Sequence, residues 1–275
     1  MRKICLSPLI FLLLGCDKVE YKRITLKGVV TQGIKNPECV FYDKSSDSLF
    51  VSHVNGATTA IDSNGYISQL SLSGKVLNSK VLDGLNAPKG IYVADGILYV
   101  TDINRIILHD LNKKGRDTII EVKGATSLND IVYAESNKLI YASDLHGNKV
   151  YILGEKEAEI SVEKPNGLFL YGESLYIGTF HKDGKIYKMS LEDPSYALDL
   201  YMSKCGPVDG LYIDDTLIVV SNFSNSLDII EKKSRDTVAY ARSNGKVNYG
   251  DFYFSGQMIV SPSMKSNEIF FLKLE

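Results

Sequence analysis

The feature that most constrains the fold of this chain is an internal repeat. Six times, a polar or glycine-led turn introduces an apolar run, which a second polar turn separates from another apolar run. The steps between equivalent positions are 51, 40, 37, 43 and 41 residues. Those positions are occupied by Glu38, Lys89, Asn129, Asn166, Asp209 and Gly250. A β-patterned repeat of about 40 residues is typical of a propeller with one four-stranded blade per repeat.

The end of the chain predicts how such a ring would close. Each of the first five repeats continues with two further runs that alternate apolar and polar residues, as half-buried strands do. The sixth repeat ends after its third strand, residues 268–274, and only Glu275 remains. Residues 22–30 can supply the missing strand and remove the free sheet edges. We therefore predict an all-β, six-bladed β-propeller whose N-terminal strand completes the last blade; a pair of β-sandwiches would leave six equivalent positions unexplained.

Composition and motifs narrow the function classes. Hydrophobic residues make up 44% of the 275 residues, which is enough to form a core. The net charge of −2 argues against nucleic acid as a partner, because such proteins carry a basic stripe. The sequence lacks the HExxH, CxxC, GxSxG, Walker and GxGxxG patterns, so zinc protease, redox, serine esterase and nucleotide-binding functions have no support. We expect a monomer, since no pattern indicates an oligomer.

The first residues predict export and a lipid anchor. Arg2 and Lys3 precede an apolar stretch over residues 4–14, which is too short to span a bilayer. The stretch ends in Leu-Leu-Gly-Cys, which resembles a bacterial lipobox, so we expect cleavage before Cys16 and lipid on its thiol. The alternatives are an ordinary signal peptide with a chance cysteine and a frayed tail. The predicted organisation is a signal peptide at 1–15, a linker at 16–21 and a propeller at 22–275, held at the cell envelope and facing the periplasm or the exterior.

Two cysteines remain in the predicted propeller, Cys39 and Cys205. They could form one disulfide or stay as two buried thiols. Two thiols are favoured, because free cysteine behaves as a small apolar residue in a core.

The six equivalent positions predict a site on the propeller axis. The first strand of each blade lies nearest the axis, so the residue at its start faces the channel mouth. Two carboxylates and two amides then converge there with one lysine. Hard oxygen ligands suit Ca²⁺ best, with Mg²⁺, Mn²⁺ or Zn²⁺ as alternatives. Asn129, Asn166 and Asp209 are also ordinary turn residues when taken singly. Glu38 and Lys89 have no turn preference and so carry the functional interpretation.

These residues resemble a known family. The chain is similar to the senescence marker protein/gluconolactonase/luciferin-regenerating enzyme family, which includes regucalcin, and more distantly to the paraoxonases. The similarity covers residues 30–275 and rests on Pro37-Glu38, Asn129-Asp130, Pro165-Asn166-Gly167 and Asp209-Gly210 with Asp214. The resemblance implies one divalent metal ion near the axis, held by Glu38, Asn166 and Asp209. It also implies that Asn129 contacts substrate or a metal-bound water, and that Asp209 acts as general base.

Two functions follow from this pattern. The first is a metal-dependent hydrolase of a small molecule such as a lactone or a related ester. There Asp209 or Asp130 accepts a proton, and Lys89 stabilises an oxyanion or binds an anionic group. The second is a non-catalytic, lipid-anchored propeller that binds a sugar, peptide or protein, with a structural metal ion.

Three histidines follow the second strand of a repeat, on the same face as the predicted site: His53, His146 and His181. They could line the pocket, and His146 or His181 could bind substrate and transfer protons. The alternative is that they are solvated turn residues.

Overall fold

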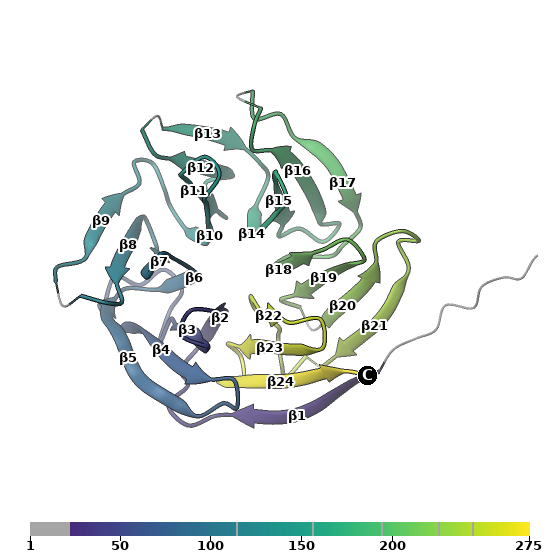
Figure 1. The fold of residues 1–275 in the computed structure, drawn as a ribbon, viewed down its shortest axis with the longest axis horizontal. Coiled ribbons are helices and arrows are strands. Elements are labelled where there is room, and N and C mark those ends of the chain that lie inside the picture. Colours follow the sequence, from purple (N-terminus) through teal and green to yellow (C-terminus); the bar gives the residue numbers. More distant parts are fainter. Residues whose placement is uncertain (1–22, 114, 156, 194, 225, 244) are drawn as a thin grey trace, which may run out of the picture.

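Six four-stranded antiparallel sheets surround a central axis, so the propeller prediction is confirmed (Figure 1). The computed structural model describes residues 23–275 except positions 114, 156, 194, 225 and 244. The predicted signal peptide, the linker and Cys16 lie outside the described residues. Within the described part, no helix is long and apolar enough to cross a bilayer.

The strands follow the predicted repeats closely. Blade 1 contains β2 (Pro37–Asp43), β3 (Ser48–His53), β4 (Gly65–Ser71) and β5 (Val76–Leu85). Blade 2 contains β6 (Pro88–Ala94), β7 (Ile97–Asp102), β8 (Arg105–Asp110) and β9 (Thr118–Glu121). Blade 3 contains β10 (Leu128–Ala134), β11 (Leu139–Asp144), β12 (Lys149–Leu153) and β13 (Ala158–Ser161).

Blade 4 contains β14 (Pro165–Tyr171), β15 (Ser174–Thr179), β16 (Lys185–Ser190) and β17 (Asp199–Ser203). Blade 5 contains β18 (Val208–Ile213), β19 (Leu217–Asn222), β20 (Ser226–Glu231) and β21 (Thr237–Arg242). Blade 6 contains β22 (Tyr253–Phe254), β23 (Met258–Ser263), β24 (Glu268–Leu274) and β1 (Ile24–Val30).

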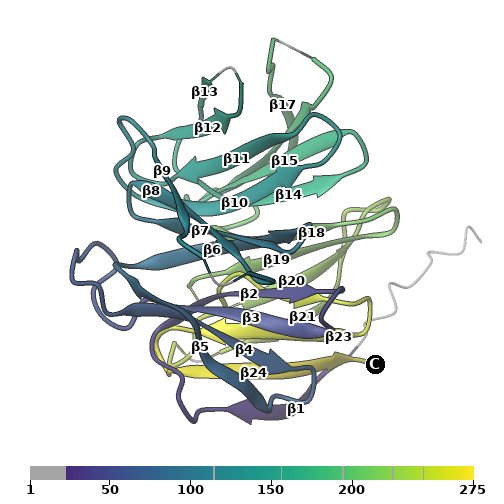
Figure 2. The same cartoon turned by 60° about the vertical axis from the view of Figure 1, so that its left-hand side comes forward.

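The N-terminal strand closes the ring as predicted. Strand β1 pairs antiparallel with β24, in a register that runs from Ile24 opposite Leu274 to Val30 opposite Ile269. Both views show the two strands side by side at the rim of the ring (Figures 1 and 2). The first and last strands of the chain therefore share a single sheet, and the ring cannot open without breaking this pairing.

Hydroxyl groups join neighbouring blades near the axis. Ser143 Oγ in β11 donates to the Asn166 carbonyl of blade 4 at 2.8 Å and accepts from the Asp130 N–H at 2.9 Å. Ser221 Oγ in β19 donates to the Gly250 carbonyl of blade 6 at 2.9 Å, and Thr101 in β7 donates in the same way to Asn129 of blade 3. These bonds satisfy inner-strand backbone groups that face an adjacent blade rather than a β-ladder.

Two glycines allow the inner strands to approach closely. A Cβ atom on Gly90 would lie 2.6 Å from the Asn129 carbonyl oxygen of the next blade. A Cβ atom on Gly167 would clash in the same way with the Asp209 carbonyl of blade 5. Only glycine fits these contacts, and the resulting narrow hub brings side chains from different blades together.

Blade 6 departs from the predicted pattern in its inner strand. The repeat predicts a first strand comparable with the others, but β22 contains only Tyr253 and Phe254. The preceding backbone pairs with blade 1 instead: Asp251 forms a parallel bridge with Cys39, and the Val40 N–H donates to the Asp251 carbonyl at 2.9 Å. Cys39 and Cys205 are both free thiols, as favoured, although Cys205 is only partly buried.

Removing one of the hydroxyls between blades tests their contribution. We expect Ser143→Ala to lower the free energy of unfolding by about 1–3 kcal/mol, because two buried backbone groups lose their partner. Urea denaturation measures the change, with Ser203→Ala at an exposed strand end as the matched control. Equal stability of the two variants would show that the hydroxyl does not hold the blades.

Candidate axial cation site

Six equivalent positions of the repeat make up what we call the polar ring: Glu38, Lys89, Asn129, Asn166, Asp209 and Gly250. The first five are the second residues of inner strands β2, β6, β10, β14 and β18, and Gly250 precedes β22. All five side chains in it are at most 5% exposed. Glu38 interacts electrostatically with Lys89 and Asp209, and Asn166 bonds to Asp209, so these four groups are buried near one another.

Most of the oxygens in the polar ring lack a partner within the protein. Asn166 Nδ2 donates to Asp209 Oδ1 at 2.7 Å. The Oδ1 atom of the same amide is buried and accepts no hydrogen bond. The Glu38 Oε2, Asn129 Oδ1 and Asp209 Oδ2 atoms are also buried and unpaired. Buried polar atoms are normally satisfied, so four unpaired oxygens in one ring need an explanation.

The charges in the ring repel one another. Burial raises the pKa of Glu38 well above its usual value, and the nearby Asp209 carboxylate raises it further, while Lys89 opposes the shift. Burial raises the pKa of Asp209 to about 7, against the effect of the Asn166 hydrogen bond. A bound cation would relieve both desolvation and repulsion.

Lys89 is the positively charged residue of the polar ring. It is 4% exposed, and burial lowers its pKa while Glu38 acts in the opposite direction. Its Nζ atom lies 3.5 Å from the Ala87 carbonyl, which is the limit of hydrogen-bond range. The ammonium group therefore retains capacity for another acceptor.

The oxygens of the polar ring suit a hard cation. Glu38, Asn166 and Asp209 offer two carboxylates and one amide oxygen, which is the ligand chemistry of Ca²⁺ or Mg²⁺. Among the described residues, no three His, Cys, Asp or Glu side chains are grouped as a metal site. The predicted ligand set has a different composition, because its third ligand is an amide.

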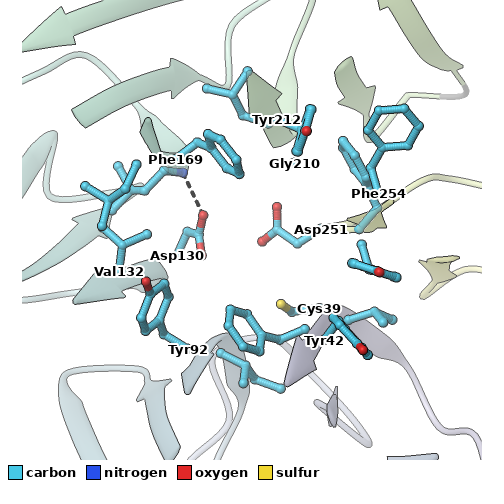
Figure 3. Close-up of a pocket in the computed structure, with 18 residues that line it drawn as sticks. Cys39, Tyr42, Tyr92, Asp130, Val132, Phe169, Gly210, Tyr212, Asp251 and Phe254 are labelled. Atoms are coloured by element: carbon cyan, nitrogen blue, oxygen red, sulfur yellow. Dashed lines mark hydrogen bonds between the residues drawn. The ribbon is translucent and has the colours of Figure 1, made fainter. Parts of the chain in front are cut away.

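Asp130 lies one residue beyond the polar ring and is close enough to raise the pKa of both Glu38 and Asp209. Its carboxylate accepts the Leu168 N–H at 2.6 Å and the Ile131 N–H at 2.7 Å. Burial raises its pKa to about 7, although both backbone bonds lower it. Together with Cys39 and Asp251, Asp130 lines a cavity of about 350 Å³ (Figure 3).

Aromatic side chains surround this cavity, and the sequence analysis missed them. Three residues after each member of the polar ring stand Phe41, Tyr92, Val132, Phe169, Tyr212 and Tyr253, and all six line the cavity. The same repeat alignment contained the signal, since five of the six equivalent positions are aromatic.

The predicted histidines do not gather around the polar ring. His53 is fully buried, bonds to Ser68 Oγ at 2.8 Å, and has its pKa lowered to about 3 by burial. It is therefore a neutral structural residue rather than part of a pocket wall. His146 and His181 are exposed in turns that follow β11 and β15, and a role in substrate binding stays a prediction.

Comparison with known proteins supports the fold alone. No protein-family model and no curated protein matches the chain. Among solved structures, streptogramin B lyase is similar with a TM-score of 0.65 at 12% identity, covering 92% of this chain and 98% of its own. An inactive virginiamycin B lyase from Staphylococcus aureus with quinupristin has a TM-score of 0.63 at 12% identity, covering 92% and 100%. The β-propeller domain of Cps50 (Swd1) from Myceliophteria thermophila has a TM-score of 0.66 at 12% identity, covering 92% and 100%.

The raised pKa of Asp209 predicts a pH-dependent stability difference. The folded state holds the Asp209 proton more tightly than the unfolded state does. The stabilisation that this proton contributes is complete below pH 3.8, the usual pKa of the group, and is lost as the pH rises to about 7. In chelator, Asp209→Asn should therefore equal the parent near pH 4 and exceed its stability by on the order of 3 kcal/mol above pH 7.

Chemical denaturation across this pH range measures the difference. The exposed Asp236→Asn variant is the matched control and should show no such trend relative to the parent. A constant stability difference between Asp209→Asn and the parent at all pH values would contradict the raised pKa of Asp209.

Proposed function

We propose that this protein is a lipid-anchored, divalent-cation-dependent hydrolase of lactones or related esters. The observation that carries the proposal is the set of four buried, unpaired oxygens in the polar ring. An isolated propeller hub would not keep two mutually repelling carboxylates out of water without a compensating ligand. A hard cation is the compensation that fits carboxylate and amide oxygens.

Glu38, Asn166 and Asp209 would hold the cation. The Asn166 amide donates its N–H to Asp209, and this bond orients its own oxygen away from that carboxylate and leaves it available as a ligand. When bound, a divalent cation would polarise the ester carbonyl and lower the pKa of a water molecule. Ca²⁺ is the preferred ion, with Mg²⁺, Mn²⁺ and Zn²⁺ as alternatives.

The remaining polar residues would bind the substrate and move the proton. Asp130 is suited to accept a proton, because its pKa of about 7 lies near neutral pH. Asp209 is the other candidate for this role, as the family resemblance implies. The Lys89 ammonium would stabilise negative charge on the carbonyl oxygen, and Asn129 Oδ1 would contact substrate or water.

The comparisons are compatible with an enzyme and do not identify the reaction. Two of the similar propellers are named as lyases, of virginiamycin B and of streptogramin B. Their identity to this chain is 12%, so they bear on the fold. The choice of a lactone or ester rests on the resemblance of the polar ring to the gluconolactonase family.

Hydrolysis of a lactone and of an aryl ester, with and without chelator, tests this proposal. Turnover should disappear in chelator and return with Ca²⁺. Glu38→Gln should lower kcat/KM by about a hundredfold or more, because it removes an anionic ligand from the buried ring. The exposed Glu231→Gln is the matched control and should behave like the parent.

A second function is favoured by the burial of the same oxygens. Each of the four unpaired atoms is inaccessible to solvent, so an ion held there would be enclosed by protein, as a structural ion is. In that case the propeller would bind a sugar, peptide or protein without catalysis. Tight Ca²⁺ binding by calorimetry, without turnover of either substrate class, would support this second function. If the protein showed neither Ca²⁺ binding nor turnover, both proposed functions would be contradicted.

The lipid anchor is a separate part of the proposal. It rests on the sequence around Cys16, and it would place the propeller at a bacterial membrane surface, facing the periplasm or the exterior. Several acyl chains on Cys16 would hold the protein firmly at the membrane, whereas a single chain would bind the membrane only marginally.

Replacing the predicted lipidated cysteine tests the anchor. Cys16→Ala should move the protein from the membrane fraction to the soluble fraction and abolish labelling by a radioactive fatty acid. Cys205→Ala is the matched control, and it should leave both properties as in the parent. Fatty-acid labelling that persists in Cys16→Ala would overturn the lipoprotein assignment.

A further inference from the structure

The cavity beside the polar ring has the chemistry of a second binding site. Its volume of about 350 Å³ falls within the range of small-molecule pockets. It is lined by residues that follow the polar-ring members along the inner strands. No function assigned above uses its aromatic wall.

The wall consists of aromatic rings that hold one another in position. Phe41 and Tyr92 of neighbouring blades have ring centroids 5.2 Å apart, and those of Phe169 and Tyr212 are 5.1 Å apart. Tyr42 stacks on Tyr253 with centroids 4.7 Å apart. These contacts link rings from adjacent blades around the cavity, so the wall is preformed (Figure 3).

Two tyrosine hydroxyls are tied to turns by carboxylates. Tyr42 donates to Asp47 at 2.8 Å, and Tyr212 donates to Asp214 at 3.1 Å. Both bonds run to the loop that follows the inner strand, and they fix the orientation of the rings. The wall therefore presents aromatic rings without free hydroxyl groups at these two positions.

The floor of the cavity carries two carboxylates. Asp130 and Asp251 point into it from opposite sides (Figure 3). Asp251 is 6% exposed, and its Oδ2 atom is buried without a partner. The residues that line the cavity include no Lys, Arg or His. This acidic floor therefore has no cationic side chain to neutralise it within the cavity.

We propose that this cavity binds a small organic ammonium ion with apolar substituents. Ring faces attract cations electrostatically, most strongly when the cation is desolvated, and quaternary ammonium groups are recognised in this way. The two carboxyl groups at the floor can ionise to supply a countercharge; burial raises the pKa of both, and a bound cation would favour their charged form. A bare metal ion is a poor match, because the wall provides carbon faces where a hard ion needs oxygen ligands. This inference does not depend on the hydrolase or on a cation in the polar ring.

Calorimetric titration of the full chain with choline, and with its uncharged carbon isostere dimethylbutanol, tests the proposal. The two probes have nearly the same shape and differ in charge. We expect choline to bind at least about tenfold more tightly, because only the charged probe gains from the ring faces and the carboxylates. Equal affinity of the two probes, or no binding of choline, would overturn the proposal.

Substitutions at the cavity locate the binding. Asp251→Asn and Tyr212→Leu should each weaken choline binding by about tenfold. Asp236→Asn and Tyr240→Leu, which alter exposed residues on blade 5, are the matched controls and should bind like the parent. Thermal melting confirms that each variant is folded. The comparison of the two probes uses the parent protein, so it decides the question even where a variant fails to fold.

Discussion

The close contact of six inner strands around the axis is the constraint on which the rest of the structure depends. Glycines at Gly90 and Gly167 let backbone touch backbone, and hydroxyl groups on the second strands bridge to the next blade. The hub is therefore narrow. Any charged side chain placed at the start of an inner strand is desolvated and lies close to its counterparts from other blades.

This close contact brings side chains from equivalent positions of the repeat together at the hub. Glu38 and Asp209 are separated by most of the chain, yet each raises the electrostatic cost of ionising the hub. The Asn166 amide satisfies only one of the oxygens. The same geometry that crowds the carboxylates also leaves their remaining oxygens without donors, and this combination favours a bound cation.

Much of the fold could be predicted because its signal repeats. The equivalent positions predicted the number of blades. The sixth repeat lacked a fourth strand after residues 268–274, which identified residues 22–30 as its replacement, as the pairing of β1 with β24 confirms. The short β22 could not be predicted, because its cause is a non-local bridge between Asp251 and Cys39. The burial of His53 was likewise hidden, since a histidine in a turn and a histidine packed on Tyr66 have the same local sequence.

The candidate site was only partly predictable for a related reason. Side chains at the starts of the inner strands were expected to converge, and they do so in the polar ring. Asp130 accepts the Leu168 N–H of the next blade, a non-local bond that the sequence does not reveal. It lines the cavity together with Asp251, and its predicted part in catalysis stays a prediction.

The most direct test of the central claim is a crystal structure determined with Mn²⁺, whose anomalous scattering locates the ion without ambiguity. The account predicts a single strong peak on the axis, coordinated by oxygens of Glu38, Asn166 and Asp209. A hub without a peak, in which the Lys89 ammonium bonds to both carboxylates, would contradict it.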